Sequence, residues 1–70
     1  MTKQSFVDAT KGMMNSIRQW DGHKIACVGW HSDPWKLVDT YDFDTVTRDE
    51  YVPLAVFHTR EDLWNYLKTI

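Results

Sequence analysis

Apolar residues recur every three or four positions through the first part of the chain. This spacing predicts a helix over residues 5–20, because positions three and four apart share one face of a helix. Ser5 and Asp8 form a capping-box-like start. Asp21-Gly22 supplies residues that commonly end a helix. The positions on the apolar face are Phe6, Ala9, Met13, Ile17 and Trp20.

Two segments that follow, residues 23–31 and 35–43, are rich in β-branched and aromatic residues and predict strands. A turn-forming Ser-Asp-Pro sequence lies between them, so we expect a hairpin closed by residues 31–34. Cross-strand pairs of aromatic and aliphatic side chains would stabilise this hairpin. The expected pairs are Trp30 with Trp35 and Val28 with Leu37.

The polar residues 44–50 predict a loop or a continuation of the second strand into a turn. Thr47 and Glu50 have the spacing of a capping box, but Pro53 would soon break a helix that began there. A third strand is expected over residues 51–57. Because Pro53 has no N–H for a strand ladder, this strand belongs at an edge of the sheet.

The last residues give the clearest helix signal in the chain. Thr59 has the side chain of an N-cap, and Asp62 completes a capping-box-like pair three residues later. Leu63, Leu67 and Ile70 are expected to form the buried stripe, with Trp64 and Tyr66 on its two sides.

These elements predict one α+β domain over residues 1–70, in the order α-β-β-β-α. Short connections favour a three-stranded antiparallel meander. Both helices are expected to pack on one face of the sheet, because an apolar sheet face must be covered. The other face would remain partly open.

Length and cysteine content set further limits. A chain of 70 residues with 43% apolar content is typical of a single globular domain. Cys27 is the only cysteine, so no intramolecular disulfide can form, which is typical of reducing compartments. The first residues have no apolar run typical of a signal peptide. We therefore expect a cytoplasmic protein that does not associate with membranes.

Charge is divided unevenly along the chain. The net charge is −2, but the basic residues outnumber the acidic ones by two in residues 1–36, and the acidic residues outnumber the basic ones by four in residues 37–70. Five acidic residues fall between positions 39 and 50. This run either keeps the protein soluble or engages a basic partner, since surface charge selects partners and accelerates encounter.

Metal binding is not expected, because the candidate ligands are scattered. His23, His31 and His58 make no closely spaced pair with Cys27, as zinc sites usually require. His31 and Asp33 form only a weak pair in a turn. Cys27 lies where a small apolar side chain packs, and His23 would be about 13 Å from it along an extended strand.

Catalysis is not expected either. Asp42 and Asp44 share one face of the second predicted strand, but acid–base chemistry needs a sheltered cleft that shifts one pKa. A short chain of this kind encloses little such space. It also contains no glycine-rich phosphate loop. We expect no enzyme activity and no cofactor.

The chain has more large aromatic side chains than two short helices can cover. Tyr and Trp are enriched in binding hot spots, so some of them are expected to form a contact patch beside the acidic run. Scattered exposure is the alternative. The expected partner-binding residues are Trp30, Trp35, Asp39, Tyr41, Asp42, Asp44, Asp49, Glu50 and Tyr51.

Together these features favour a non-enzymatic protein-interaction module. Small acidic domains are common among phage and mobile-element accessory proteins, so we expect an inhibitor or adaptor of a host protein, such as a basic nucleic-acid-handling protein. A self-assembling structural module, in which sheet edges pair into a homodimer, is the alternative. Direct binding of single-stranded nucleic acid, with bases stacked on Trp30, Trp35 and Tyr41, is disfavoured by the acidic balance.

Overall fold

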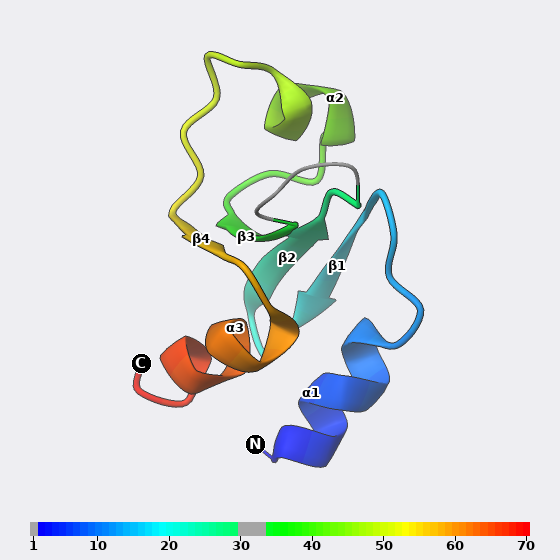
Figure 1. Cartoon of the computed structure of the whole chain (residues 1–70), viewed down its shortest axis with the longest axis vertical. Helices are drawn as coiled ribbons and strands as arrows, with labels where there is room; N and C mark the ends of the chain where they lie inside the picture. Colours follow the sequence, from blue (N-terminus) through cyan, green and yellow to red (C-terminus); the bar gives the residue numbers. More distant parts are fainter. Residues whose placement is uncertain (1, 30–33) are drawn as a thin grey trace.

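The computed structural model of the chain describes residues 2–29 and 34–70. Within them, four strands form one antiparallel sheet in the order β1-β2-β3-β4, and three helices pack around it (Figure 1). The α+β class is confirmed. The expected order with three strands is wrong, because the described chain runs α-β-β-β-α-β-α. The elements are α1 (Lys3–Thr10), β1 (Ser16–Trp20), β2 (His23–Cys27), β3 (Trp35–Val38), α2 (Phe43–Thr47), β4 (Ala55–Phe57) and α3 (Arg60–Leu67).

The expected helix over residues 5–20 is wrong beyond its first half. α1 ends at Thr10, and the chain then passes through Gly12 and Asn15, whose φ angles are 71° and 52°. These values are incompatible with a right-handed helix. The following residues, Ser16–Trp20, form β1 instead.

A two-residue turn, Asp21-Gly22, joins β1 to β2. Both residues have positive φ angles, 47° and 79°, which is the combination that type I′ hairpin turns require. The Asp-Gly pair therefore closes a hairpin rather than ending a helix. Trp20 packs on one face of the sheet and Ile17 on the other, as strand residues with odd separation do.

Thr2, rather than Ser5, is the N-cap of α1. The Thr2 hydroxyl accepts a hydrogen bond from the Ser5 backbone N–H at 3.1 Å, and Ser5 Oγ accepts one from the Thr2 N–H at 3.3 Å. At the other end, the Arg18 guanidinium donates to the carbonyl oxygens of Ala9 and Lys11 at 3.2 and 3.0 Å. These bonds satisfy the end of α1 and hold it against β1.

The register between β2 and β3 differs from the expected one. The paired residues are Lys24 with Val38, Ile25 with Leu37, Ala26 with Lys36 and Cys27 with Trp35. The Val28–Leu37 pair is therefore wrong by three positions on β2. The Trp30–Trp35 pair is wrong as well, because Trp35 lies opposite Cys27, and Trp30 falls outside the described residues.

Residues 44–50 were expected to form a loop or to continue the second strand into a turn, but they contain most of α2. β3 ends at Val38, well before the expected end at residue 43. Asp42 is the N-cap of α2, and its carboxylate accepts hydrogen bonds from the N–H groups of Asp44 and Thr45. The helix covers apolar surface through Val46, which is buried.

β4 lies at an edge of the sheet, as Pro53 predicted. It is shorter than the expected strand over residues 51–57, although the Leu54 N–H extends the contact by donating to the Leu37 carbonyl oxygen at 2.9 Å. Burial alternates from Tyr51 to Phe57, with every second side chain exposed. The chain is therefore extended before the formal strand begins.

The N-cap of α3 is confirmed, because Thr59 Oγ1 accepts a hydrogen bond from the Asp62 N–H at 3.1 Å. Leu63 and Leu67 are fully buried as expected, whereas Ile70 lies beyond the helix and is 60% exposed. α1 and α3, with eight residues each, are the longest helices of the described chain. No helix there is long and apolar enough to cross a membrane.

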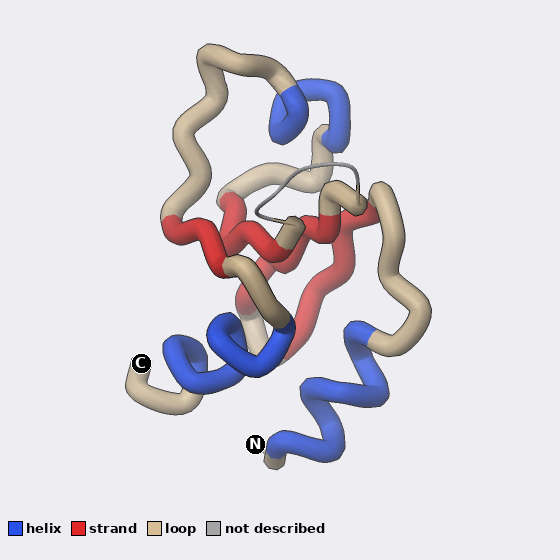
Figure 2. Tube along the Cα trace, viewed as in Figure 1, coloured by secondary structure: helices blue, strands red, loops and turns tan. Residues whose placement is uncertain are grey.

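The two faces of the sheet are covered differently (Figures 1 and 2). α1 and α3 pack on one face, as expected for two helices, and we call it the helix face. α2 packs on the opposite, outer face. The helix-face core consists of Phe6, Met13, Trp20, Ile25, Cys27, Leu37, Leu63 and Leu67. The outer-face cluster consists of Ala26, Val38 and Val46, with Ile17 and Tyr51 packed against it.

Candidate functional site

A contact between Asp39 and Tyr51 holds the chain around α2 against the outer face. The Tyr51 hydroxyl donates to the Asp39 carboxylate at 2.6 Å, and Lys24 Nζ donates to the Asp39 carbonyl oxygen at 3.0 Å. Burial of the Tyr51 ring and its hydrogen bond to Asp39 raise the pKa of the Tyr51 hydroxyl. Both residues were expected to contact a partner, and the structure gives each of them a bond within the fold.

Tyr41 is held in place and yet accessible. Its hydroxyl donates to the side-chain carbonyl of Gln19, and the Lys24 ammonium lies 5.0 Å from the ring centroid, within the range of a cation–π contact. Half of the residue remains exposed, at 51%. Tyr41 therefore offers a fixed aromatic surface immediately before α2.

Asp42 has a structural role. Besides the two backbone N–H groups that it caps, it accepts a hydrogen bond from the Thr45 hydroxyl. These bonds, with that of the Thr45 hydroxyl first, lower the pKa of the Asp42 carboxyl. The carboxylate is thus engaged by α2 itself, which distinguishes Asp42 from the other acidic residues of the run.

Asp44, Asp49 and Glu50 form what we call the acidic face. Asp44 lies in the first turn of α2, and Asp49 and Glu50 follow the helix in a turn that the Tyr51 N–H closes by donating to the Arg48 carbonyl oxygen at 3.1 Å. All three acidic residues are exposed. Their carboxylates accept no hydrogen bond and form no ion pair with any residue that the structure describes. Within residues 2–29 and 34–70 these three carboxylates are therefore unpaired.

The tryptophans contribute less exposed surface than expected. Trp35 is half-buried against the helix-face core, and the Arg60 guanidinium lies 6.0 Å from its ring centroid. Trp64 packs on Phe6 and Trp20, with ring centroids 5.6 and 6.0 Å away. Trp30 lies outside the described residues. The structure therefore brings Tyr41 and the acidic face to one region, but it does not bring Trp35 there.

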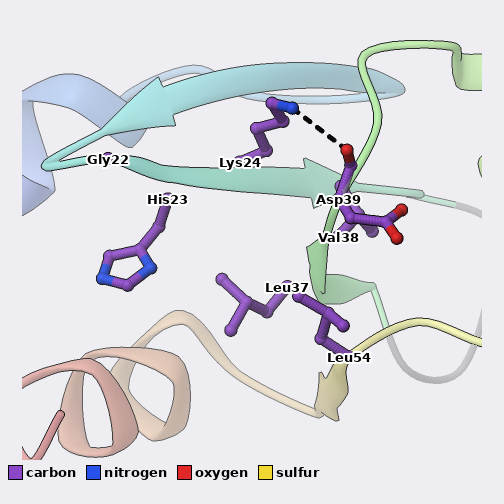
Figure 3. A pocket seen from close by; sticks show the side chains of 7 residues that line it. All are labelled: Gly22, His23, Lys24, Leu37, Val38, Asp39 and Leu54. Atoms are coloured by element: carbon purple, nitrogen blue, oxygen red, sulfur yellow. Dashed lines mark hydrogen bonds between the residues drawn. The ribbon is translucent and has the colours of Figure 1, made fainter.

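A shallow pocket of about 240 Å³ lies where β2 begins and β3 ends (Figure 3). His23 and Lys24, neighbours on β2, project to opposite sides of the strand, and the Asp39 carboxylate points away from Lys24. The volume is smaller than the roughly 300 to 1,000 Å³ of typical small-molecule sites. The titratable groups around this pocket do not converge on one point, as acid–base chemistry requires.

Cys27 packs in the core. It is 6% exposed, and desolvation by burial raises the pKa of its thiol, which opposes the thiolate form that nucleophiles and metal ligands need. Over residues 2–29 and 34–70, no three His, Cys, Asp or Glu side chains gather as a metal site would require. His31, one of the candidate ligands, falls outside these ranges.

Three exposed apolar residues were not singled out from the sequence. Val52, Leu54 and Val56 are 84%, 64% and 43% exposed and lie on the extended chain that leads into and through β4. Because residues 51–57 are apolar at nearly every position, the sequence alone carries no signal for which side faces out.

No family model, curated protein or solved structure matches the chain.

Proposed function

We propose that this protein is a non-enzymatic protein-interaction module, an inhibitor or adaptor of the small accessory type, which binds a basic surface of a protein partner. The acidic face would make the contact. The observation that carries this proposal is that Asp44, Asp49 and Glu50 are exposed and unpaired within the described chain, while Asp39 and Asp42 are bound within the fold. Asp39 and Asp42 are exposed as well, but their carboxylates already accept hydrogen bonds within the fold, so we assign the contact to the first three.

Tyr41 supports the proposal, because it supplies a fixed aromatic surface beside the acidic face. Charges at an interface steer encounter and select the partner, whereas buried aromatic side chains contribute much of the affinity. A partner that combines Lys or Arg side chains with an apolar pocket for the Tyr41 ring would bind both the acidic face and Tyr41.

We also propose that the protein is cytoplasmic, since Cys27 is the only cysteine and is buried.

The test is affinity capture from cell lysate with an immobilised chain, quantified by mass spectrometry. The variant Asp44→Asn/Asp49→Asn removes two negative charges from the acidic face. Asp42 is left unchanged, because its substitution would disturb α2. We expect the variant to recover at least several-fold less of the specifically bound protein, and the remaining binding to weaken as salt is raised.

A matched control separates the local effect from net charge. Gln4→Lys/Asn65→Lys changes the net charge by the same amount at two exposed positions on α1 and α3. This control is expected to recover as much partner as the wild type. Equal recovery by both variants would refute a role for the acidic face.

A further inference from the structure

The segment that carries the acidic face is a loop whose two ends are joined. Residues 39–51 leave the sheet after β3 and lead back towards β4, and these two strands lie side by side, with Leu37 opposite Ala55. The Tyr51 hydroxyl joins the ends, because it donates to the Asp39 carboxylate at 2.6 Å and accepts a hydrogen bond from the Asp39 N–H at 3.4 Å. Compact loops of about 6 to 16 residues with ends held in this way are often functional. We call residues 39–51 the strap.

The strap is attached to the outer face by few contacts. The structure describes every residue of the strap, and among them Val46 alone is fully buried, packed with Ala26 and Val38 of the sheet. Lys24 Nζ adds two polar contacts, since it donates to a carbonyl oxygen of the strap at 3.0 Å and lies 5.0 Å from the ring centroid of Tyr41. On the helix face, by contrast, eight buried apolar side chains of the described chain form the core.

α2 depends on this attachment. It has five residues, whereas isolated helices shorter than about 12 to 15 residues are marginal in water. The cap at Asp42 satisfies N–H groups of the first turn, but it does not replace the burial of Val46. Release of Val46 from the sheet therefore also unfolds the helix. We expect the strap to be either docked and helical or released and unfolded.

The sheet does not depend on the strap. β3 pairs with β2 on one side and with β4 on the other, and the Leu54 N–H donates to the Leu37 carbonyl oxygen. α3 packs on β3 and β4 from the helix face. Figure 1 shows α2 at the top and α1 and α3 at the bottom, with the sheet between them. All of these contacts lie outside residues 39–51, so the strap can detach without breaking them.

We propose that the strap docks on the outer face and detaches from it as one unit, while the sheet and the helix face stay folded. Proteins open locally in such units, and the free energy of opening is lowest where few buried apolar contacts hold the unit. Detachment separates Asp44, Asp49 and Glu50 from their positions in the docked strap. The docked form is therefore the one that presents the acidic face, a consequence that rests on the proposed function. A partner that binds the acidic face would shift the equilibrium towards docking.

Native-state hydrogen exchange of the full chain tests the proposal, with NMR detection at single amides and under conditions where the exchange rate reports the opening equilibrium. The reporters in the strap are the N–H groups of Val46, Arg48 and Tyr51, each of which donates to a backbone carbonyl oxygen within the strap. The ladder amides of β2 report on the rest of the fold. We expect the three strap amides to share one protection factor, at least about ten-fold below that of β2. Equal protection of the strap and β2 would overturn the proposal.

A core variant separates opening of the strap from global unfolding. Ile25→Val removes one methylene group from a fully buried side chain of the helix-face core. It destabilises the docked and the detached forms alike relative to the unfolded chain. The protection of β2 should therefore fall by about two- to ten-fold, whereas that of the strap should change by less than about two-fold. An equal fall at both places would show that the strap opens only when the whole chain unfolds, and would overturn the proposal.

A strap variant gives the complementary result. Tyr51→Phe removes a hydrogen bond to Asp39 that only the docked form contains, so the protection of the strap and that of β2 should fall by the same factor of about two to ten. Protection of Val46 that Tyr51→Phe leaves unchanged would overturn the proposal, because the helix would then open without the rest of the strap. These measurements use the chain without a partner. Failure of this proposal is therefore distinguishable from failure of the proposed function, which the capture experiment tests.

Discussion

Trp20 lies directly opposite His23 across the Asp21-Gly22 turn, and this pair begins the β1–β2 hairpin. Gly22 has a φ angle of 79°, and a Cβ atom at this position would meet no other atom within 4 Å. Any cost of adding a side chain there is therefore backbone strain rather than a steric clash with the rest of the fold. This property makes the turn a clean place to test the hairpin.

Gly22→Ala is expected to lower the free energy of unfolding by about 1 to 2 kcal/mol, the cost of a left-handed conformation for a residue with a Cβ. Asp21→Asn should change it by less than about 0.5 kcal/mol, because Asn-Gly and Asp-Gly suit the same turn. Urea denaturation monitored by tryptophan fluorescence measures both. Equal stability of Gly22→Ala and wild type would contradict the turn geometry.

The second prediction concerns the core beneath α3. Leu63 is fully buried, so Leu63→Ala should destabilise the protein by about 2 to 5 kcal/mol, which for a small domain is a large part of the total. Ile70, expected from the sequence to share its stripe, is mostly exposed, and Ile70→Ala should cost less than about 0.5 kcal/mol. Thermal unfolding of dilute samples distinguishes the two. Similar losses at both positions would mean that α3 packs differently.

The third prediction is a pH dependence at the start of α2. The Asp42 carboxyl has a lower pKa in the folded chain than in the unfolded chain, so the unfolded chain binds its proton more readily. Its stabilising contribution is therefore complete above the ordinary aspartate pKa and is lost as the pH falls through the lowered value.

Variants at Asp42 make this dependence measurable. Asp42→Asn keeps a good N-cap without the charge, so it should retain most of the stability at neutral pH and show a flatter acid limb. Asp42→Ala should be less stable than Asp42→Asn at neutral pH. Thermal midpoints between about pH 3 and pH 7 give both comparisons. An acid limb of Asp42→Asn as steep as that of the wild type would show that other carboxyl groups account for it.

The fourth prediction concerns the contact between Tyr51 and Asp39. Tyr51→Phe removes the hydroxyl that donates to Asp39 and should cost about 0.5 to 1.5 kcal/mol. The pKa of Tyr51 is raised in the folded chain, so the contribution of the hydroxyl is present below the pKa of an unfolded tyrosine and is lost as the pH rises through the raised value. Absorbance titration of the tyrosines should show one group that ionises late in the wild type and is missing in Tyr51→Phe.

The features that were predicted correctly from the sequence depend on residues close together in the chain. The cap at Thr59 depends on Asp62, three residues away, and the edge position of β4 follows from the missing N–H of Pro53. The signal at Asp21-Gly22 was ambiguous, because the same pair can end a helix or close a hairpin. Asp21-Gly22 closes a hairpin because Ser16–Trp20 pairs with β2. The local sequence does not show this pairing.

The candidate site was predictable only in part. The acidic run was visible from the charges, but which carboxylates are free depends on hydrogen bonds that form only in the fold, such as those of Asp39 with Tyr51 and of Asp42 with Thr45. The exposure of Leu54 and Val56 could not be predicted from the sequence for a different reason. A continuous apolar run has no polar side, so its outward face is set by the position of β4 at the sheet edge.

Zero-length carbodiimide cross-linking of the captured complex tests the proposed function most directly, because it joins carboxylates to amines only where they touch. Mass spectrometry then identifies which acidic residues of this chain are bonded to lysines of the partner. The acidic face predicts cross-links at Asp44, Asp49 or Glu50. Cross-links confined to acidic residues of α1 and α3, such as Asp8 and Asp62, would contradict it.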